Sequence, residues 1–124
     1  MYFTYIIRCK DDSLYTGYTT DIVRRMKEHE SGINCKYSRV KGFKRLETYF
    51  IADSKSNAMK LEYYIKRLNR NKKLWIIKNP KEFLETKAKF FMSINNKDEE
   101  KKRKKYFSIV FILVIISGLL GMMY

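Results

Sequence analysis

The stretch that decides the fold is SLYTGYTTDIVRRMKEHE, which covers Ser13–Glu30. It starts with residues typical of a β-strand, Leu14–Tyr18, and ends with an arginine pair and the chain's only histidine. Either Thr20 or Asp21 can cap a helix at this point, and Gly32 marks its expected stop. The stretch therefore predicts a strand that passes directly into a helix, and this helix is expected to end at about Glu30.

Two further strands are predicted around this unit. Tyr2–Cys9 is rich in strand-forming residues and Lys10–Ser13 has the composition of a turn, so the chain is predicted to begin with a β-hairpin. Arg45–Ala52 has the same strand-forming character and is predicted to be the third strand.

A second long helix is predicted over Lys55–Arg70, with Ser54 as its cap. One face of this helix carries an apolar stripe that suits packing on a sheet, formed by Ala58, Leu61, Ile65 and Leu68. One or two short helices are predicted beyond it, over Leu74–Ile77 and Phe83–Phe91.

The charge of the chain limits its partners. Lys and Arg number 27 against 13 Asp and Glu, which gives a formal net charge of +14. Such an excess suits a polyanion, either a nucleic acid or an anionic lipid surface, and does not distinguish the two. One stretch combines cations with Tyr37 and Phe43, a pattern that suits phosphate contacts and base stacking but also a solvated loop. Its cations are Lys36, Lys41, Lys44 and two arginines, Arg39 and Arg45.

The cysteine and histidine content limits the kind of metal site. Cys9 and Cys35 are the only cysteines, and their spacing matches neither a zinc site nor a disulfide framework. Any metal must therefore be held mainly by oxygen atoms, which points to Mg²⁺ or Mn²⁺.

Composition divides the chain into three segments, a folded domain over residues 1–91, a charged linker over 92–105 and an apolar segment over 106–124. The apolar segment, Tyr106–Tyr124, has no charged side chain, and as a helix it would span ~28 Å, close to the ~30 Å hydrocarbon core of a bilayer. The basic run Lys101–Lys105 precedes it and could attract anionic headgroups. The pattern predicts a single-pass anchor in the cell membrane, with membrane lipid as a partner and the N-terminal domain in the cytoplasm.

Three residues that can take part in catalysis have informative positions on the predicted helices. Arg25 and His29 are four residues apart, so they lie on one face of the first predicted helix. Glu62 lies beside the apolar stripe of the second long helix, where a carboxylate usually has a partner or a metal. A solvated ion pair between Glu62 and Lys66 is the alternative, and helical periodicity alone favours it slightly.

In their order these residues resemble the GIY-YIG nuclease superfamily, and most closely its small single-domain branch. The first signature element corresponds to FTY at Phe3–Tyr5, and the second to YTG at Tyr15–Gly17. Arg25 stands eight residues past Gly17, as the family's arginine does, and His29 follows four residues later. Glu62 occupies the context of the family's metal-binding glutamate. The segment CKYSR also resembles that branch, although the first element lacks the family's glycine.

The resemblance implies an α+β fold, in which a small three-stranded antiparallel sheet is flanked by helices. It also implies hydrolysis of phosphodiester bonds in a nucleic acid, with DNA as the expected substrate. Glu62 would bind Mg²⁺ or Mn²⁺ and Arg25 would neutralise the phosphate. Either Tyr5 or Tyr15 would accept the proton of the attacking water, with its pKa lowered by Arg25, His29 and the ion, and His29 would orient or share that proton. Nucleic-acid contacts are expected from Gly17, Lys36, Tyr37, Arg39, Lys41, Lys44 and Arg45.

Three functions are compatible with the sequence. The first is a metal-dependent endonuclease tethered to the membrane. The second is a membrane-tethered module that binds nucleic acid with little or no catalysis, and the third is a scaffold that binds a partner protein. A fold alone does not decide between them.

Overall fold

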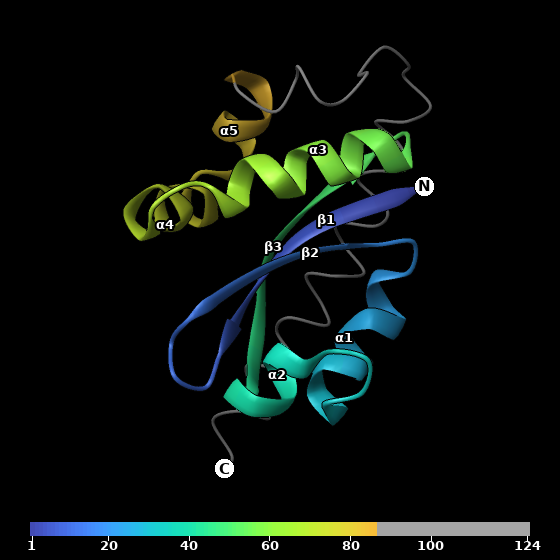
Figure 1. Cartoon of the computed structure of the whole chain (residues 1–124). Coiled ribbons are helices and arrows are strands. Elements are labelled where there is room, and N and C mark those ends of the chain that lie inside the picture. Colours follow the sequence, from blue (N-terminus) through green and yellow to red (C-terminus); the bar gives the residue numbers. More distant parts are fainter. Residues whose placement is uncertain (87–124) are drawn as a thin grey trace. The chain divides into compact units, whose positions relative to one another are not determined.

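A computed structural model describes residues 1–86 of the chain (Figure 1). Three strands, β1 (Tyr2–Cys9), β2 (Leu14–Thr19) and β3 (Phe43–Ala52), form one antiparallel sheet in the order β2-β1-β3. The five helices of residues 1–86 are α1 (Ile22–Ser31), α2 (Lys36–Lys41), α3 (Lys55–Lys66), α4 (Arg70–Lys78) and α5 (Pro80–Thr86). The predicted α+β class and the three-stranded antiparallel sheet are confirmed.

The register of the sheet brings the two signature elements together. Tyr5 of β1 pairs with Gly17 of β2, and Ile7 pairs with Tyr15. Because side chains alternate between the two faces of a strand, Tyr5, Gly17 and Tyr15 share one face. On the other side of β1, Tyr5 pairs with Tyr49 of β3.

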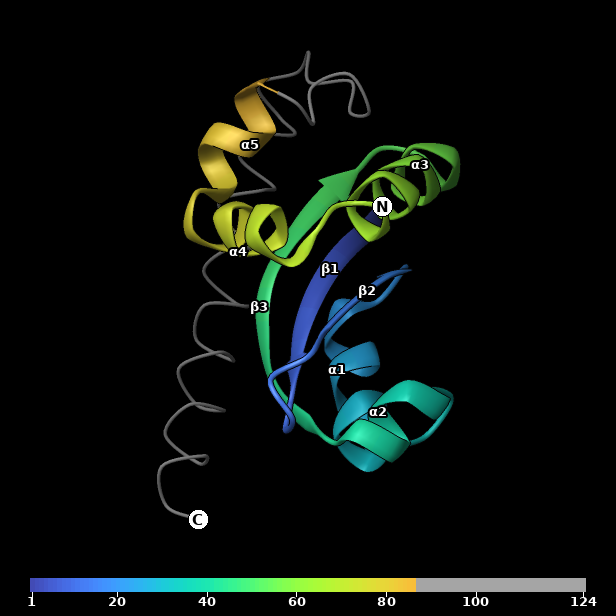
Figure 2. The ribbon, with the colours of Figure 1, turned by 60° about the vertical axis from the view of Figure 1, so that its left-hand side comes forward.

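The opposite face of the sheet carries the apolar core and is covered by α3 (Figure 2). The Thr4 hydroxyl donates a hydrogen bond of 2.8 Å to the Ala58 carbonyl, which fixes α3 against β1. Ile6 is packed on the same side, in a core cluster with Phe50, Leu61, Ile65, Ile76 and Phe83. The predicted stripe of α3 is confirmed, since Ala58, Leu61 and Ile65 are fully buried and Leu68 packs against the cluster.

Helices α1 and α2 lie on the face that carries Tyr5 (Figures 1 and 2). The Asp21 side chain accepts a hydrogen bond from the Arg24 backbone N–H, so Asp21 rather than Thr20 caps α1. Gly32 follows the helix in the left-handed conformation, with φ of 69°, which a glycine adopts without strain. The predicted strand-to-helix unit is therefore confirmed at both ends.

One helix and several element boundaries differ from the prediction. The basic stretch that was predicted without a helix contains α2, and β3 begins at Phe43 rather than at Arg45. Helix α3 ends at Lys66 rather than at Arg70, because the Asn69 side chain accepts a hydrogen bond from the Lys72 N–H and starts a new helix there. Helix α4 extends the predicted segment in both directions, and α5 begins at Pro80.

The predicted linker at 92–105, with Lys101–Lys105, and the predicted span at 106–124 lie outside the described residues, as does the end of the last predicted helix. Within residues 1–86, none of the helices has the length and apolar character needed to cross a membrane.

Candidate functional site

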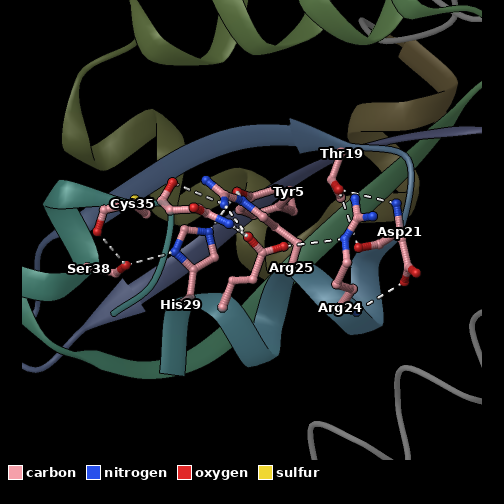
Figure 3. Close-up of polar contacts among 10 residues, drawn as sticks. Tyr5, Thr19, Asp21, Arg24, Arg25, His29, Cys35 and Ser38 are labelled. Atoms are coloured by element: carbon pink, nitrogen blue, oxygen red, sulfur yellow. Dashed lines mark hydrogen bonds and ion pairs between the residues drawn. The ribbon is translucent and has the colours of Figure 1, made fainter. Parts of the chain in front are cut away.

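The Tyr5 hydroxyl lies at the centre of a hydrogen-bonded cluster on the α1 side of the sheet (Figure 3). Its oxygen is 2.7 Å from Nε2 of His29 and accepts a hydrogen bond of 3.2 Å from Nε of Arg25. Tyr5 and His29 are both fully buried. Because Arg25 and His29 are one turn apart on α1, the helix presents both side chains to one tyrosine, as their spacing predicts.

Gly17 makes room for this tyrosine. A Cβ atom at Gly17 would lie 2.5 Å from the Tyr5 hydroxyl oxygen and 2.8 Å from Cζ, with the Tyr15 ring at 3.2 Å. These separations are shorter than van der Waals contacts allow, so only glycine fits beneath the Tyr5 ring. Gly17, predicted to contact nucleic acid, is covered instead by the two tyrosines of the site.

Gly17→Ala is expected to push the Tyr5 hydroxyl away from His29 and Arg25, and overpacking of this kind typically costs about 1–3 kcal/mol of stability. The free energy of unfolding would be measured by chemical denaturation, together with the double variant Tyr5→Phe/Gly17→Ala. Removing the hydroxyl should restore part of the stability lost in Gly17→Ala, although Tyr5→Phe alone destabilises the protein. Strictly additive effects of the two substitutions would contradict the close approach.

Arg25 is held in place by three groups. Besides the bond from Nε to Tyr5, its Nη1 lies 3.3 Å from the Glu28 carboxylate and donates to the Asn34 carbonyl at 3.2 Å. The Asn34 side chain in turn donates to Glu28 at 2.7 Å. Nη2 has no partner among residues 1–86, and 18% of the side chain is exposed. The guanidinium is therefore fixed in orientation and keeps one end available for an anion.

His29 is uncharged at neutral pH. Burial, followed by the nearby positive charge of Arg25, lowers the pKa of His29 to about 4. The prediction that His29 supplies positive charge to lower the pKa of a tyrosine is therefore wrong. Its Nδ1 lies 3.0 Å from the hydroxyl of Ser38 in α2, and its ring stacks on Phe43 with centroids 6.2 Å apart.

The low pKa of His29 predicts acid sensitivity. Between pH 6.5 and about 4 the unfolded chain binds a proton at this histidine and the folded protein does not, so stability is lost as pH falls through this window. The loss amounts to roughly 3 kcal/mol. Urea denaturation across the window should therefore show a steeper fall for the wild type than for His29→Gln. Equal slopes for the two proteins would contradict a neutral, buried His29.

Tyr15 connects α1, α2 and α3 at the edge strand β2. Its ring meets His29 edge-on at 5.6 Å between centroids, stacks on Tyr37 at 5.1 Å, and lies 5.8 Å from Nζ of Lys66. Burial first, then the Cys35 thiol, raises the pKa of Tyr15, and the Glu62 carboxylate raises it further.

The pKa of Tyr5 is raised as well, by burial, and the hydrogen bond and charge of Arg25 offset this only in part. The expected lowering of a tyrosine pKa by neighbouring cations is thus outweighed by desolvation. Both tyrosines are protonated at neutral pH.

Glu62 of α3 is linked to the site by its electrostatic effect on Tyr15. Among the described residues its one ion pair joins Oε1 to Nζ of Lys66 at 3.1 Å, and 20% of the side chain is exposed. The predicted alternative, an ion pair with Lys66, is therefore present. Within residues 1–86, Glu62 makes no contact with Tyr5, Arg25 or His29. The charge of Glu62 nevertheless raises the pKa of Tyr15.

The donor set at Glu62 limits which metal it can hold. Residues 1–86 contain no group of three or more His, Cys, Asp or Glu side chains arranged to hold a metal. One accessible carboxylate with a free oxygen nevertheless fits Mg²⁺ or Mn²⁺, which take most of their ligands from water and phosphate. Cys9 and Cys35 are free, buried thiols.

Three of the five cations in the predicted basic stretch form ion pairs within the molecule. Lys41 pairs with Asp11 at 3.3 Å, Lys44 with Asp12 at 3.3 Å and Arg45 with Glu47 at 2.6 Å. Lys36 and Arg39 have no ion pair within the described domain, so these two cations of α2 remain available, close in sequence to Tyr37. The pairs of Lys41 and Lys44 are exposed and therefore weak, so these two cations can still exchange partners, whereas the carboxylate of Glu47 that binds Arg45 is mostly buried.

A groove of about 370 Å³ lies elsewhere, along the second half of α3, and is lined by Lys60, Tyr63, Tyr64, Arg67 and Leu68. None of the five predicted catalytic residues lines it. The cluster around Tyr5 and Tyr15 is therefore distinct from this groove.

Sequence reasoning missed Ser38 and Glu28, which contact His29 and Arg25 respectively. Glu28 could have been found, since it lies three residues after Arg25 on one helix. Ser38 left no such signal, because its contact with His29 depends on how α2 packs against α1.

A family model described as the GIY-YIG catalytic domain matches residues 1–74. A UPF0213 protein of Clostridium perfringens is 44% identical over 77 residues, which cover 62% of this chain and 83% of that protein. A UPF0213 protein of Halalkalibacterium halodurans is 50% identical over 72 residues, which cover 58% and 77%. The solution NMR structure of a UPF0213 protein from Bacillus halodurans is 47% identical, covers 63% of this chain and 84% of that one, and has a TM-score of 0.42.

Proposed function

The chain belongs to the GIY-YIG family, and from this premise we propose that it is a metal-dependent endonuclease that hydrolyses phosphodiester bonds in DNA. The observation that carries the proposal is the cluster in which one buried tyrosine holds Arg25 and contacts His29. Tyr5 lies on β1, and Arg25 and His29 lie on α1. Gly17 leaves the space that the Tyr5 side chain occupies in this cluster. Perturbed tyrosine and histidine pKa values in one cluster are also typical of functional sites.

In this proposal Arg25 binds the scissile phosphate through its free Nη2. The bonds to Tyr5, Glu28 and Asn34 fix the guanidinium before the substrate arrives, so little reorganisation is needed as negative charge grows on the phosphate. A planar, charged donor suits a phosphate better than a lysine at this position.

We assign different tasks to the two tyrosines. Tyr5 is fully buried, so water cannot reach it directly, and its task is to hold Arg25. Tyr15 is only partly buried and lies between the cluster and Glu62, so it is the tyrosine placed to accept a proton from the attacking water. His29, also fully buried, positions Tyr5 rather than contacting the substrate.

Glu62 would hold Mg²⁺ or Mn²⁺ through one carboxylate oxygen, with Lys66 released from its ion pair. When bound, the ion supplies positive charge that polarises the phosphate and stabilises the leaving oxygen. The positive charge of the ion would also lower the pKa of Tyr15, which opposes the effect of Glu62 on that pKa.

Nucleic-acid contacts are assigned to α2, which adjoins the cluster. Lys36 and Arg39 supply cations that have no ion pair within residues 1–86, and Tyr37 stacks on Tyr15. Lys41, Lys44 and Arg45 contribute if the phosphate backbone replaces their present acidic partners. Contacts of this kind bind the backbone and do not read base sequence.

Two observations favour the alternative of a binding module without catalysis. Glu62 is paired with Lys66, and both tyrosines are protonated at neutral pH in the free protein. A module of this kind would retain DNA in a salt-sensitive manner, as the nuclease would, but would not cut it.

The membrane anchor is a separate proposal. It is supported by the uncharged segment Tyr106–Tyr124 and the preceding basic run Lys101–Lys105. The protein should accordingly stay with the membrane fraction after alkaline extraction, with its N-terminal domain on the cytoplasmic side. Recovery of the full chain in the soluble fraction would contradict the anchor without affecting the nuclease proposal.

The proposed activity is tested with the full chain on duplex, branched and single-stranded DNA and on RNA, with Mg²⁺ or with EDTA. We expect cutting of at least one DNA substrate in Mg²⁺ and none in EDTA. Salt-dependent binding with no cutting of any substrate would favour the binding module instead.

A further inference from the structure

A continuous chain of hydrogen bonds runs through the cluster and ends in α2 (Figure 3). Arg25 Nε donates to the Tyr5 oxygen at 3.2 Å, and that oxygen is 2.7 Å from His29 Nε2. His29 Nδ1 is 3.0 Å from Ser38 Oγ, which donates to the Cys35 carbonyl at 3.3 Å. Ser38 is buried, with 2% of its surface exposed, and is not one of the proposed catalytic or nucleic-acid-binding residues.

The two ends of this chain fix its direction. Arg25 Nε–H can only donate and the Cys35 carbonyl can only accept. Ser38 has one hydroxyl proton, and while that proton points to Cys35, Ser38 can only accept from Nδ1 of His29. His29 is neutral, because burial lowers its pKa to about 4, so a proton on Nδ1 leaves Nε2 bare.

A bare Nε2 suits Tyr5, whose proton then has an acceptor while its oxygen receives the Arg25 N–H. In the opposite tautomer His29 Nε2–H and Arg25 Nε–H would both donate to the Tyr5 oxygen. The buried Tyr5 proton would then have no acceptor among residues 1–86, which is costly for a buried group. Only the first arrangement satisfies every group of the chain.

We propose that Ser38 is a positioning residue, which holds His29 in the Nδ1–H tautomer so that the Tyr5 oxygen stays directed at Arg25. The inference rests on the proposed function for its effect on catalysis, but the tautomer is a property of the free protein. Without the Ser38 hydroxyl, His29 is free to place its proton on Nε2 and compete with Arg25 for the Tyr5 oxygen. Arg25 would then lose the bond that orients its guanidinium toward the phosphate.

The tautomer can be measured directly, because His29 is the only histidine of the chain. Long-range ¹H–¹⁵N correlation spectra of the full chain at neutral pH should show a protonated Nδ1 and a bare Nε2. Ser38→Ala should shift the ring to the Nε2–H tautomer or to a mixture, and Ser38→Thr, which keeps the hydroxyl, should not. An Nε2–H ring in the wild type, or an unchanged ring in Ser38→Ala, overturns the proposal.

Cleavage kinetics test the positioning task. With Mg²⁺, Ser38→Ala should cut roughly ten- to a hundredfold more slowly with unchanged DNA affinity, and Ser38→Thr should restore most of the rate. Val40→Ala, at an exposed position of the same helix, serves as the control and should leave the rate unchanged. A Ser38→Ala protein with a changed tautomer and a wild-type rate overturns the positioning task.

Two further outcomes are distinguishable. If Ser38→Ala does not fold, the wild-type spectrum and the Ser38→Thr variant still decide whether the tautomer is as proposed. If the wild type shows the Nδ1–H ring and Ser38→Ala shifts it, but no substrate is cut, the nuclease function fails while the part played by Ser38 in the hydrogen-bonded chain is upheld.

Discussion

Arg25→Ala is expected to slow DNA cleavage by about 100- to 1,000-fold, with only a small change in DNA affinity. The reason is its fixed orientation. Nε is bonded to the buried Tyr5 hydroxyl and Nη1 to Glu28 and Asn34, so Nη2 is presented to a phosphate without further ordering of the side chain. An effect confined to the transition state lowers the rate and leaves binding nearly intact.

Arg24 provides a matched control for this prediction. It is the neighbouring residue on α1, carries the same charge and also pairs with Glu28, at 3.3 Å. Its side chain is 61% exposed, however, and it makes no contact with Tyr5. Single-turnover rates and binding constants of Arg24→Ala and Arg25→Ala should be compared, and similar losses in both variants would show that net charge rather than orientation matters.

Glu62→Gln is expected to abolish Mg²⁺-dependent cleavage, with a loss of at least about 100-fold that added Mg²⁺ does not restore. The substitution keeps the shape of the side chain and removes the charge that a hard cation requires. Because Glu62 makes its ion pair with Lys66 at the surface of α3, the fold should remain intact.

Measurements of metal binding by Glu62→Gln show whether Glu62 or another group holds the metal. Mn²⁺ binding to the protein–DNA complex should weaken in Glu62→Gln and not in Glu30→Gln, a change at an exposed residue near the end of α1. Loss of cleavage with unchanged Mn²⁺ binding would mean that another group holds the metal.

The strands and the first helix could be predicted from the sequence because each carries local signals. The strand-forming residues of Tyr2–Cys9 lie within their strand, and the cap at Asp21 and the stop at Gly32 directly flank α1. Helix α2 has no comparable pattern, since it has six residues, its capping residue is Cys35 and half of its side chains are basic. The break after Lys66 depends on the cap made by Asn69, and several asparagines in this region could have had that role.

The candidate site could be predicted only in its residue types and spacing. Arg25 and His29 lie on one face of a helix, which fixes their proximity, and the register of the hairpin brings Tyr5 and Tyr15 to one face. The pKa directions could not be predicted, because they depend on burial, which the helices of the folded domain create. The contact of Ser38 with His29 likewise requires α2 to pack on α1.

Single-turnover cleavage of DNA by the full chain, in Mg²⁺ and in EDTA, is the measurement that tests the central claim most directly. Wild type, Arg25→Ala, Arg24→Ala and Glu62→Gln would be compared at protein concentrations that saturate the DNA. The account predicts Mg²⁺-dependent strand scission by the wild type and Arg24→Ala, and near-complete loss in the other two variants with the DNA still bound. Scission that survives in both Arg25→Ala and Glu62→Gln, or no scission by the wild type on any bound DNA, would contradict a nuclease site built from these residues.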